Sequence, residues 1–240
     1  EAGAYINQEL NIMLGSALKL GIQSTTTGVN TTNFYFPEGL WCDVFKKVDA
    51  ATNCITSPPG GSTKTLSSFA YDFYLHLRGG YMVPMQDAKA LKVKTSQDLK
   101  VAPFDLHVLP VCDAQKCAAT GRYLNDDGIS VDVKGAQNIY TLTYTQPVGG
   151  AITLTVTIVE EGVVVDMNDV LGSLQIYNAA AQGLNTDLYK VVATKKDATT
   201  IDLGQTAVYD AQSDRLMWKA ADGQAAANLP EIDFITLTAA

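Results

Sequence analysis

The sequence predicts an all-β protein built from two consecutive antiparallel β-sandwich domains, preceded by a short N-terminal helix. Three observations lead to this fold class. Apolar residues alternate with polar ones at a period of two in many segments, as in strands that pack on one side. Gly, Asn, Asp and Pro interrupt these segments at short intervals, which favours antiparallel sandwiches over alternating βαβ units. A helical period occurs convincingly only at the N-terminal end.

The first two elements are predicted from a change of period. The helical spacing i, i+4, i+7, i+8 falls on Ile6, Leu10, Met13 and Leu14. From residue 17 the period becomes two, which indicates a strand packed on one side. In this strand, one side carries Leu18, Leu20 and Ile22, and the other carries Lys19 and Gly21.

Further strands follow along the chain. The clearest alternation covers residues 73–78, 140–144 and 152–158, where Leu, Ile, Val, Tyr and Phe alternate with polar residues, many of them Thr. Shorter candidates are residues 91–94, 105–109, 129–133, 162–165, 174–177, 189–193, 200–203, 216–219 and 232–237. The tract 57–62 (SPPGGS) is predicted to be an exposed loop, and the boundary between the two domains is predicted near residues 87–90.

Composition limits the possible functions. The chain has 240 residues, of which 47% are hydrophobic and 18% charged, with a formal net charge of −8. It is therefore an ordered, acidic chain with enough apolar residues for one large core or two small ones. No run approaches the ~18 apolar residues of a membrane span, and the 17 Lys and Arg form no basic block for nucleic acid. Only two histidines are available for a triad or a metal site.

The cysteines predict an oxidising compartment. Cys42 and Cys54, and likewise Cys112 and Cys117, are sequence neighbours that lack the partner ligands of a zinc site. Two local disulfides are the simplest interpretation, although four cysteines permit three pairings. The sequence Asn-Thr-Thr at Asn30 is a glycosylation sequon, which together with paired cysteines predicts a secretory, lysosomal or extracellular location. Because the chain begins at Glu1 without a leader, we expect a processed product or a piece of a longer protein.

Two acidic clusters are the candidates for chemistry. Residues 125–128 (NDDG) fit a tight turn, and a calcium site is the alternative, although the spacing does not match a calcium-binding loop. Residues 166–169 (DMND) follow an apolar run and fit a turn that ends a strand. Their alternative is a carboxylate held for catalysis at the end of a buried strand.

Histidines and aromatic residues are the remaining candidates. His76 and His107 fall on the outward phase of apolar alternations, which predicts polar contacts at a surface or between domains. Large aromatics could stack on sugar rings, although in sandwiches they more often fill cores or seams; the candidates are Trp41, Tyr71, Tyr74 and Trp218. No Gly-x-Ser-x-Gly nucleophile elbow is present.

Four segments, in order, resemble motifs of glycoside hydrolase family 31, the α-glucosidase family. Residues 34–43 (FYFPEGLWCD) resemble the family's Y-(L/F)-P-x-G-x-W-Y-D strand and turn. Residues 75–86 (LHLRGGYMVPMQ) resemble its R-(G/A)-G-x-I-(I/L)-P-x-Q segment. Residues 121–130 (GRYLNDDGIS) are similar to its G-x-L-(Y/F)-x-D-D-G-x-S signature, and residues 14–18 (LGSAL) resemble the stretch that follows its catalytic barrel.

The resemblance implies a chain without the catalytic barrel. It implies that residues 1–22 contain the connection from the barrel and the first strand, residues 23–88 the proximal C-terminal sandwich, and residues 89–240 the distal one. The family's two catalytic aspartates belong to the barrel. The DMND segment lacks the Trp and the final Glu of the nucleophile motif and follows the DDG signature instead of preceding it, so Asp166 is not assigned as nucleophile. No catalytic, substrate-binding or metal-binding residue and no cofactor is predicted for this chain.

The leading hypothesis is therefore a supporting role. The chain would be the non-catalytic C-terminal chain of a retaining α-glucosidase that hydrolyses terminal α-1,4-linked glucose, and its partner would be the catalytic (β/α)8 barrel. Part of its apolar content should then lie on a face shaped for that partner. Two alternatives stay open: a carbohydrate-binding sandwich module, and a structural component derived from a degenerate relative.

Overall fold

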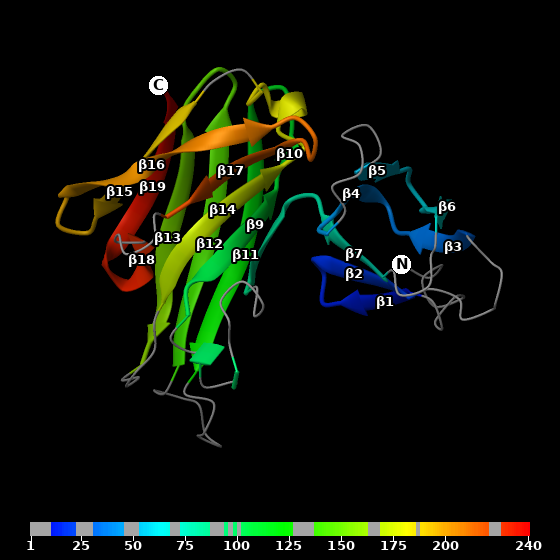
Figure 1. The fold of residues 1–240 in the computed structure, drawn as a ribbon, viewed down its shortest axis with the longest axis horizontal. Coiled ribbons are helices and arrows are strands. Elements are labelled where there is room, and N and C mark those ends of the chain that lie inside the picture. Colours follow the sequence, from blue (N-terminus) through cyan, green and yellow to red (C-terminus); the bar gives the residue numbers. More distant parts are fainter. Residues whose placement is uncertain are drawn as a thin grey trace. The chain divides into compact units, whose positions relative to one another are not determined.

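The computed structural model confirms the all-β class. It describes residues 11–22, 31–45, 53–67, 73–86, 94–95, 98–99, 102–126, 137–162, 169–185, 188–220 and 227–240. These form two compact units (Figure 1). Unit 1 comprises residues 1–81 with 211–213, and unit 2 comprises residues 82–210 with 214–240. The division falls between Tyr81 and Met82, earlier than the predicted boundary at residues 88–89, which lies outside the described residues.

The described strands of unit 1 are short. They are β1 (Asn11–Leu14), β2 (Leu18–Ile22), β3 (Thr31–Phe36), β4 (Gly39–Asp43), β5 (Cys54–Ser57), β6 (Ser62–Ser67) and β7 (Phe73–Arg78). The predicted N-terminal helix is wrong where it can be tested, because residues 11–14 form β1 and pair with β2. Residues 1–10 lie outside the described part. Of the four residues with helical spacing, Met13 and Leu14 are described, and in β1 they lie on opposite sides of the sheet: Met13 packs on the aromatic core and Leu14 lies on the other side.

Unit 2 contains longer strands and two 3₁₀ turns. They are β8 (Tyr81–Met85), whose first residue belongs to unit 1, β9 (Phe104–Leu109), β10 (Val111–Cys112), β11 (Lys116–Asp126), β12 (Gln137–Pro147), β13 (Ile152–Glu161), β14 (Val170–Tyr177), η1 (Ala180–Gln182), β15 (Tyr189–Lys195), β16 (Thr200–Asp210), β17 (Arg215–Lys219), β18 (Ala227–Asn228), η2 (Leu229–Glu231) and β19 (Ile232–Ala239).

Unit 1 stacks a five-stranded sheet and a two-stranded sheet around an aromatic core. Among the described residues, the strand orders are β1-β2-β7-β4-β5 and β3-β6. The buried core between them consists of Phe34, Phe36, Trp41 and Tyr74. Aromatic residues of β3 therefore pack on the inward side of the larger sheet.

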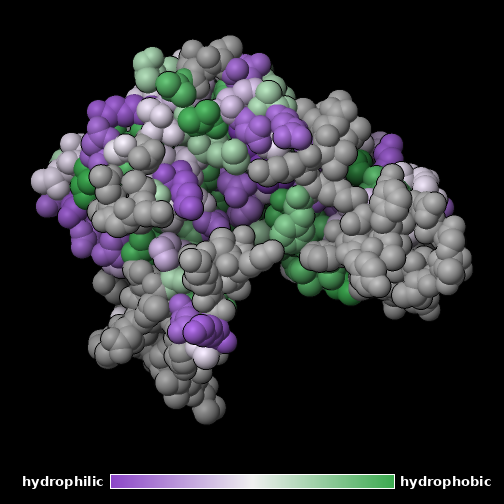
Figure 2. Space-filling model, viewed as in Figure 1, coloured by the Kyte–Doolittle hydropathy of each residue, from purple (hydrophilic) through white to green (hydrophobic). Residues whose placement is uncertain are grey.

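The five-stranded sheet has a second apolar side, which faces away from this core. Direct pairing places residues of β1, β2 and β7 in two cross-strand rows, and opposite residues share a face. The rows are Ile12–Leu20–Leu75 and Leu14–Leu18–Leu77. Ile12 and Leu14 are 38% and 45% exposed, whereas Leu77 is buried. Figure 2 shows hydrophobic residues gathered over β1 and β2. We call these six residues the aliphatic face.

Lys19 lies on the opposite side of β2, which is the buried one. The side of this strand that carries the charge therefore faces inward and the leucine side faces outward, the reverse of what the alternation predicted. The Lys19 side chain is fully buried, and its ammonium lies 4.5 Å from the ring centroid of Phe36 and 5.2 Å from that of Phe34. Gly21, two residues on, leaves room for the Phe34 ring, which a Cβ would approach to 2.8 Å. The leucines of β2 are turned outward because the aromatic residues of β3 already occupy the inward side.

Unit 2 closes its sheet into a ring. Among the described strands the path runs β11-β12-β13-β19-β15-β16-β17-β14-β9-β8, and β8 also pairs with β11. A closed ring thus replaces the two separate sheets expected here. From β11 round to β14 the successive pairs are antiparallel, whereas β14 and β9 run parallel. The core inside the ring is mainly Leu, Ile, Val and Tyr, which agrees with the predicted alternation in β12 and β13.

A glycine permits the closure between β8 and β11. A Cβ on Gly121 would lie 2.5 Å from the backbone oxygen of Met82. Such a contact is too short for any side chain, so the two strands approach this closely only with glycine at position 121. Each of the two disulfides joins directly opposed residues of neighbouring strands, Cys42 with Cys54 in β4–β5 and Cys112 with Cys117 in β10–β11.

The burial of Lys19 predicts an alkaline gain in the stability of unit 1. Burial lowers the pKa of Lys19 from 10.5 to about 8, so the folded chain disfavours the protonated amine. Between these values the unfolded chain binds the extra proton, and stability therefore rises with pH. His76 and Asp43 continue the same cross-strand row, and Tyr74 stacks on His76.

The test replaces Lys19 by Met, which keeps the length of the side chain without the charge. We expect Lys19→Met to stabilise unit 1 at pH 7 by on the order of 3 kcal/mol and to remove the rise between pH 8 and 10. Urea unfolding is followed by Trp41 fluorescence in a Trp218→Phe background. Equal pH dependence in the two chains would contradict a buried, desolvated amine.

Candidate functional site

The strongest polar constellation of unit 2 surrounds Asp169, directly before β14. This side chain is 3% exposed. Its Oδ1 accepts a 2.7 Å hydrogen bond from Nδ2 of Asn125, and its Oδ2 accepts bonds of 2.7 Å from Nδ2 of Asn138 and 2.6 Å from the hydroxyl of Tyr140. Three neutral donors from β11 and β12 thus hold one carboxylate, which compensates for the water that it loses on burial.

The structure brings one residue from each predicted acidic cluster together. Asn125 belongs to the first cluster and Asp169 to the second, and they are hydrogen-bonded. Sequence reasoning missed this contact, because it treated each cluster as a separate turn. Residues 127–128 and 166–168 lie outside the described residues. Asp169 serves as an acceptor for three fixed donors, an arrangement that ties strands together.

A stack of aromatic rings extends from this carboxylate. Tyr140 stacks on Tyr123 with ring centroids 5.9 Å apart, and Tyr123 stacks on Phe104 at 4.3 Å. Burial, and to a smaller extent the negative charge of Asp169, raises the pKa of the Tyr123 hydroxyl, which therefore stays protonated. The rings of β9, β11 and β12 are thus fixed relative to the buried charge.

Both histidines are buried, which corrects the prediction of outward positions. His107 of β9 is 7% exposed, and its Nδ1 lies 2.6 Å from the hydroxyl of Tyr177. The guanidinium of Arg215 lies 4.1 Å from the ring centroid of Tyr177 and donates to Oε1 of Gln175 at 3.1 Å. Burial, together with the positive charge of Arg215, lowers the pKa of His107 to about 4, so its imidazole is neutral near pH 7.

His76 belongs to the aromatic core of unit 1. It is 2% exposed, stacks on Tyr74 and meets the edge of Phe36. The prediction that His76 faces outward is wrong for the same reason as for Lys19. The inward side of this sheet carries polar residues among aromatic ones.

The aromatic residues proposed as sugar platforms are not available for stacking. Trp41, Tyr74 and Trp218 are each at most 4% exposed, and Tyr71 lies outside the described residues. Trp41 donates from Nε1 to the carbonyl of Pro37 at 2.8 Å and lies under the guanidinium of Arg78. Binding of glycan by these three residues is therefore excluded.

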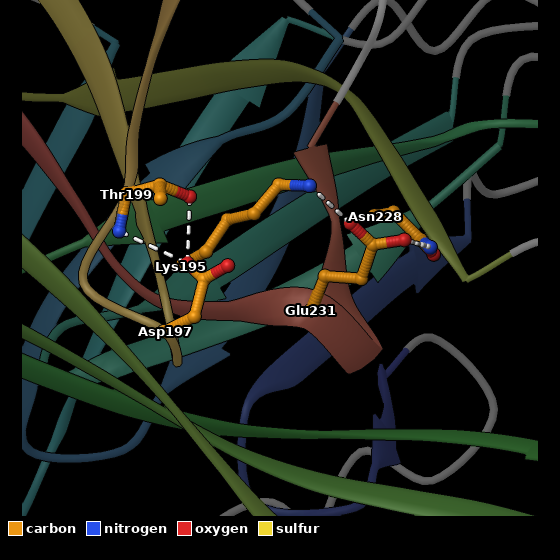
Figure 3. A network of polar contacts seen from close by, with 5 residues as sticks. All are labelled: Lys195, Asp197, Thr199, Asn228 and Glu231. Carbon is orange, nitrogen blue, oxygen red and sulfur yellow. Dashed lines mark hydrogen bonds and ion pairs between the residues drawn. The ribbon is translucent and has the colours of Figure 1, made fainter.

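An exposed polar cluster lies beside the β15–β16 turn (Figure 3). In Figure 3, Nζ of Lys195 lies 2.7 Å from Oε2 of Glu231, while Oε1 of Glu231 accepts a bond from Asn228. Beside them, Asp197 accepts bonds from the backbone and hydroxyl of Thr199. These contacts order the exposed β15–β16 turn and tie it to η2, and exposed ion pairs of this kind contribute little to stability.

Metal-binding and membrane-spanning features are not found in the part of the chain that the structure describes. No three His, Cys, Asp or Glu side chains there are grouped to hold a metal ion. No helix in the same residues has the length and apolarity needed to cross a membrane. Asn30 of the sequon is outside the described residues.

The segments that resemble family motifs contact one another across neighbouring strands. Arg78 of the second segment covers Trp41 of the first and donates to the carbonyl of Glu38 at 3.2 Å. Met82, also in the second segment, meets Gly121 of the third. Both contacts join neighbouring strands, β4 with β7 in the first case and β8 with β11 in the second.

Comparison with solved structures shows the same fold within much larger proteins. The chain is similar to the glucosidase II alpha subunit in its Tris-bound form (TM-score 0.65, 18% identity), covering 95% of this chain and 23% of that one. It is also similar to a mutant of the Flavobacterium johnsoniae GH31 dextranase complexed with isomaltotriose (TM-score 0.63, 16% identity, 95% and 26% covered).

A third similar structure is the ER glucosidase II heterodimeric complex of a catalytic subunit with the binding domain of a regulatory subunit (TM-score 0.61, 17% identity, 92% and 22% covered). No protein-family model matches the sequence. The chain therefore shares its fold with about a quarter of the length of these solved proteins.

Replacement of Asp169 by Asn tests the structural role of the buried carboxylate. Asn offers one acceptor oxygen for three donors, so at least one donor loses its partner. We expect a loss of about 3–5 kcal/mol in the free energy of unfolding of unit 2. The matched control is Asp233→Asn, an exposed position on β19, which should change stability by less than about 0.5 kcal/mol. Equal effects in urea unfolding would contradict the network.

The position of His107 predicts a loss of stability in acid. Its pKa is about 4 in the folded chain against 6.5 for a free histidine. Between these values only the unfolded chain binds the proton, so stability falls as the pH drops from 6.5 toward 4, by on the order of 3 kcal/mol. His107→Asn keeps an acceptor for Tyr177 and should flatten this slope. Urea unfolding of unit 2 measures this pH dependence, followed by Trp218 fluorescence in a Trp41→Phe background. An unchanged slope in His107→Asn would show that His107 is not its source.

Proposed function

We propose that this chain is a non-catalytic C-terminal portion of a family 31 glycoside hydrolase, and that it supports a catalytic (β/α)8 barrel carried elsewhere in the enzyme. The observation that carries the proposal is the aliphatic face of the five-stranded sheet in unit 1. The fold likeness to glycosidases, over about a quarter of their length, supplies the class of partner.

The aliphatic face has the chemistry of a docking surface. Its six side chains are all Leu or Ile, they lie in two adjacent rows, and no charged residue interrupts them. Ile12 and Leu14 are 38% and 45% exposed, so complete burial would stabilise each by only about 1 kcal/mol more. Contiguous apolar side chains on one face of a sheet mark an interaction surface.

The shape of a barrel suits this face. The outer helices of a (β/α)8 barrel present apolar stripes, and a sheet covers such stripes with alternate residues of each strand. The rows across β1, β2 and β7 offer three strands for that contact. In this proposal residues 1–22 lead from the barrel into β1 and β2, residues 23–88 form the proximal domain, and residues 89–240 form the distal domain.

The proposed reaction belongs to the whole enzyme. A retaining α-glucosidase uses one carboxylate as nucleophile and a second as acid and then base, and we place both on the barrel. Asp169, the best-held carboxylate in the described part of this chain, is surrounded by structural donors. The substrate class proposed for the complete enzyme is the terminal α-1,4-linked glucose of maltose-type glucans.

A lumenal, lysosomal or extracellular location is proposed with this function. The support is the two disulfides together with the sequon at Asn30.

The test places a charge on the aliphatic face. The chain, wild type or Leu14→Asp, is produced together with the barrel portion of its enzyme and recovered through a tag on the chain. Because docking would bury the new carboxylate, we expect Leu14→Asp to weaken the complex at least tenfold and to lower the recovered maltose hydrolysis equally.

The matched control is Thr63→Asp, an exposed position on β6 in the other sheet of unit 1. It should leave recovery unchanged, and Trp41 fluorescence should show that both variants are folded. A wild-type chain that retains no barrel portion would refute the proposal.

A further inference from the structure

One end of the ring in unit 2 contains a cavity of about 490 Å³. Its wall is formed by the β12–β13 turn, by η1 with the residues that follow it, by the start of β15 and by the end of β19, close to the C-terminus (Figure 1). The mouth of a β-barrel is a frequent place for ligand sites, and this volume lies within their usual range of ~300–1,000 Å³. The cavity is therefore large enough for a small organic molecule.

Two glutamine side chains that line the cavity are held by their amide nitrogens. Nε2 of Gln182 donates to the carbonyls of Tyr177 at 2.7 Å and of Asn178 at 2.9 Å. Nε2 of Gln146 donates to the carbonyl of Gln182 at 3.3 Å. Because a carbonyl oxygen only accepts hydrogen bonds, these contacts fix the orientation of both amides. Each side-chain oxygen therefore points away from the carbonyls that hold its nitrogen.

Both amide oxygens converge on a single hydroxyl. Oε1 of Gln146 and Oε1 of Gln182 each lie 3.1 Å from the hydroxyl oxygen of Tyr144. Burial, and to a smaller extent Tyr189, raises the pKa of the Tyr144 hydroxyl, which therefore keeps its hydrogen. A phenol has one hydrogen to donate, and both distances exceed the ~2.7–2.8 Å typical of O–H···O bonds. One donor is thus divided between two acceptors.

The oxygen of Gln146 is the acceptor that water reaches least. Gln146 is only 6% exposed. In the part of the chain that the structure describes, the hydroxyl of Tyr144 alone donates to either amide oxygen. A buried acceptor without a full hydrogen bond costs free energy, which a bound donor recovers. The site therefore lacks one hydrogen-bond donor.

The rest of the wall is apolar and uncharged. Leu184, Leu237 and Val148 supply aliphatic surface, and Tyr189 also lines the cavity. No Asp, Glu, Lys, Arg or His belongs to the described residues of this wall. A charged ligand would lose water here without meeting an opposite charge, so the wall favours a neutral one.

We propose that this cavity binds a small neutral molecule that is largely apolar and carries one N–H or O–H donor. The donor bonds to the oxygen of Gln146, which leaves the hydrogen of Tyr144 to Gln182. The apolar body of the ligand lies on Leu184 and Leu237. The proposal rests on the hydrogen bonds of unit 2 and uses neither the aliphatic face nor its partner, so either proposal can fail without the other.

The test is calorimetric titration of the full 240-residue chain with indole and, in parallel, with 1-methylindole, which lacks the N–H donor. We expect indole to bind with a dissociation constant on the order of 1 mM. 1-Methylindole should bind at least about fivefold more weakly, because the buried acceptor then stays without its donor. The methyl group adds apolar surface, so a cavity that recognised apolar surface alone would prefer 1-methylindole.

Gln146→Met removes the buried acceptor at a similar side-chain length. Tyr144 then donates to Gln182 alone, and the preference for indole should disappear. The matched control is Gln137→Met, at the opposite end of β12, which should keep the preference. Urea unfolding without ligand shows whether both variants are folded.

Three results would overturn the proposal. They are the absence of indole binding to the wild type, equal or tighter binding of 1-methylindole, and a preference for indole that persists in folded Gln146→Met. The order of the two affinities in the wild type decides the proposal even where Gln146→Met does not fold.

Discussion

The organisation of unit 2 depends on one buried charge. Asp169 has lost nearly all its water, and an ionised carboxylate tolerates this only where fixed donors replace the solvent. The donors come from Asn125 on β11 and from Asn138 and Tyr140 on β12. The start of β14 is thereby tied to two strands on another part of the ring. The same bonds orient the amide of Asn125 and anchor the aromatic stack through Tyr140.

Local pattern predicted which segments are strands far better than it predicted which side faces inward. The strands around residues 140–144 and 152–158 lie where the alternation places them, since one side meets a single apolar core. In β2 and β7 both sides are apolar in different ways, one aliphatic and one aromatic with Lys19 and His76 among the rings. A period of two cannot tell these sides apart, because the choice depends on the β3 strand that packs against them.

Contacts between distant segments were beyond the reach of the sequence. The closure of the ring needs Gly121 to meet the backbone of Met82, and the Asp169 network joins residues 29 to 44 positions apart. Neither the Gly121–Met82 contact nor the Asp169 network produces a periodic pattern in the sequence. β14 pairs in parallel with β9 on one side and antiparallel with β17 on the other. Gly121 and Asn125 were visible within a family-like segment, but their partners were found only in the folded chain.

The family-like segments support the fold, whereas the aliphatic face supports the proposed function. The family-like segments supply contacts between strands. Trp41 lies under Arg78, Met82 meets Gly121, and Asn125 donates to Asp169. These contacts stabilise the architecture, so they support the fold and say nothing about chemistry. The aliphatic face differs, because Ile12 and Leu14 remain 38% and 45% exposed within the part of the chain that the structure describes. Exposed apolar side chains gathered on one face point to a partner, and for this reason the supporting role rests on this face more than on the motifs.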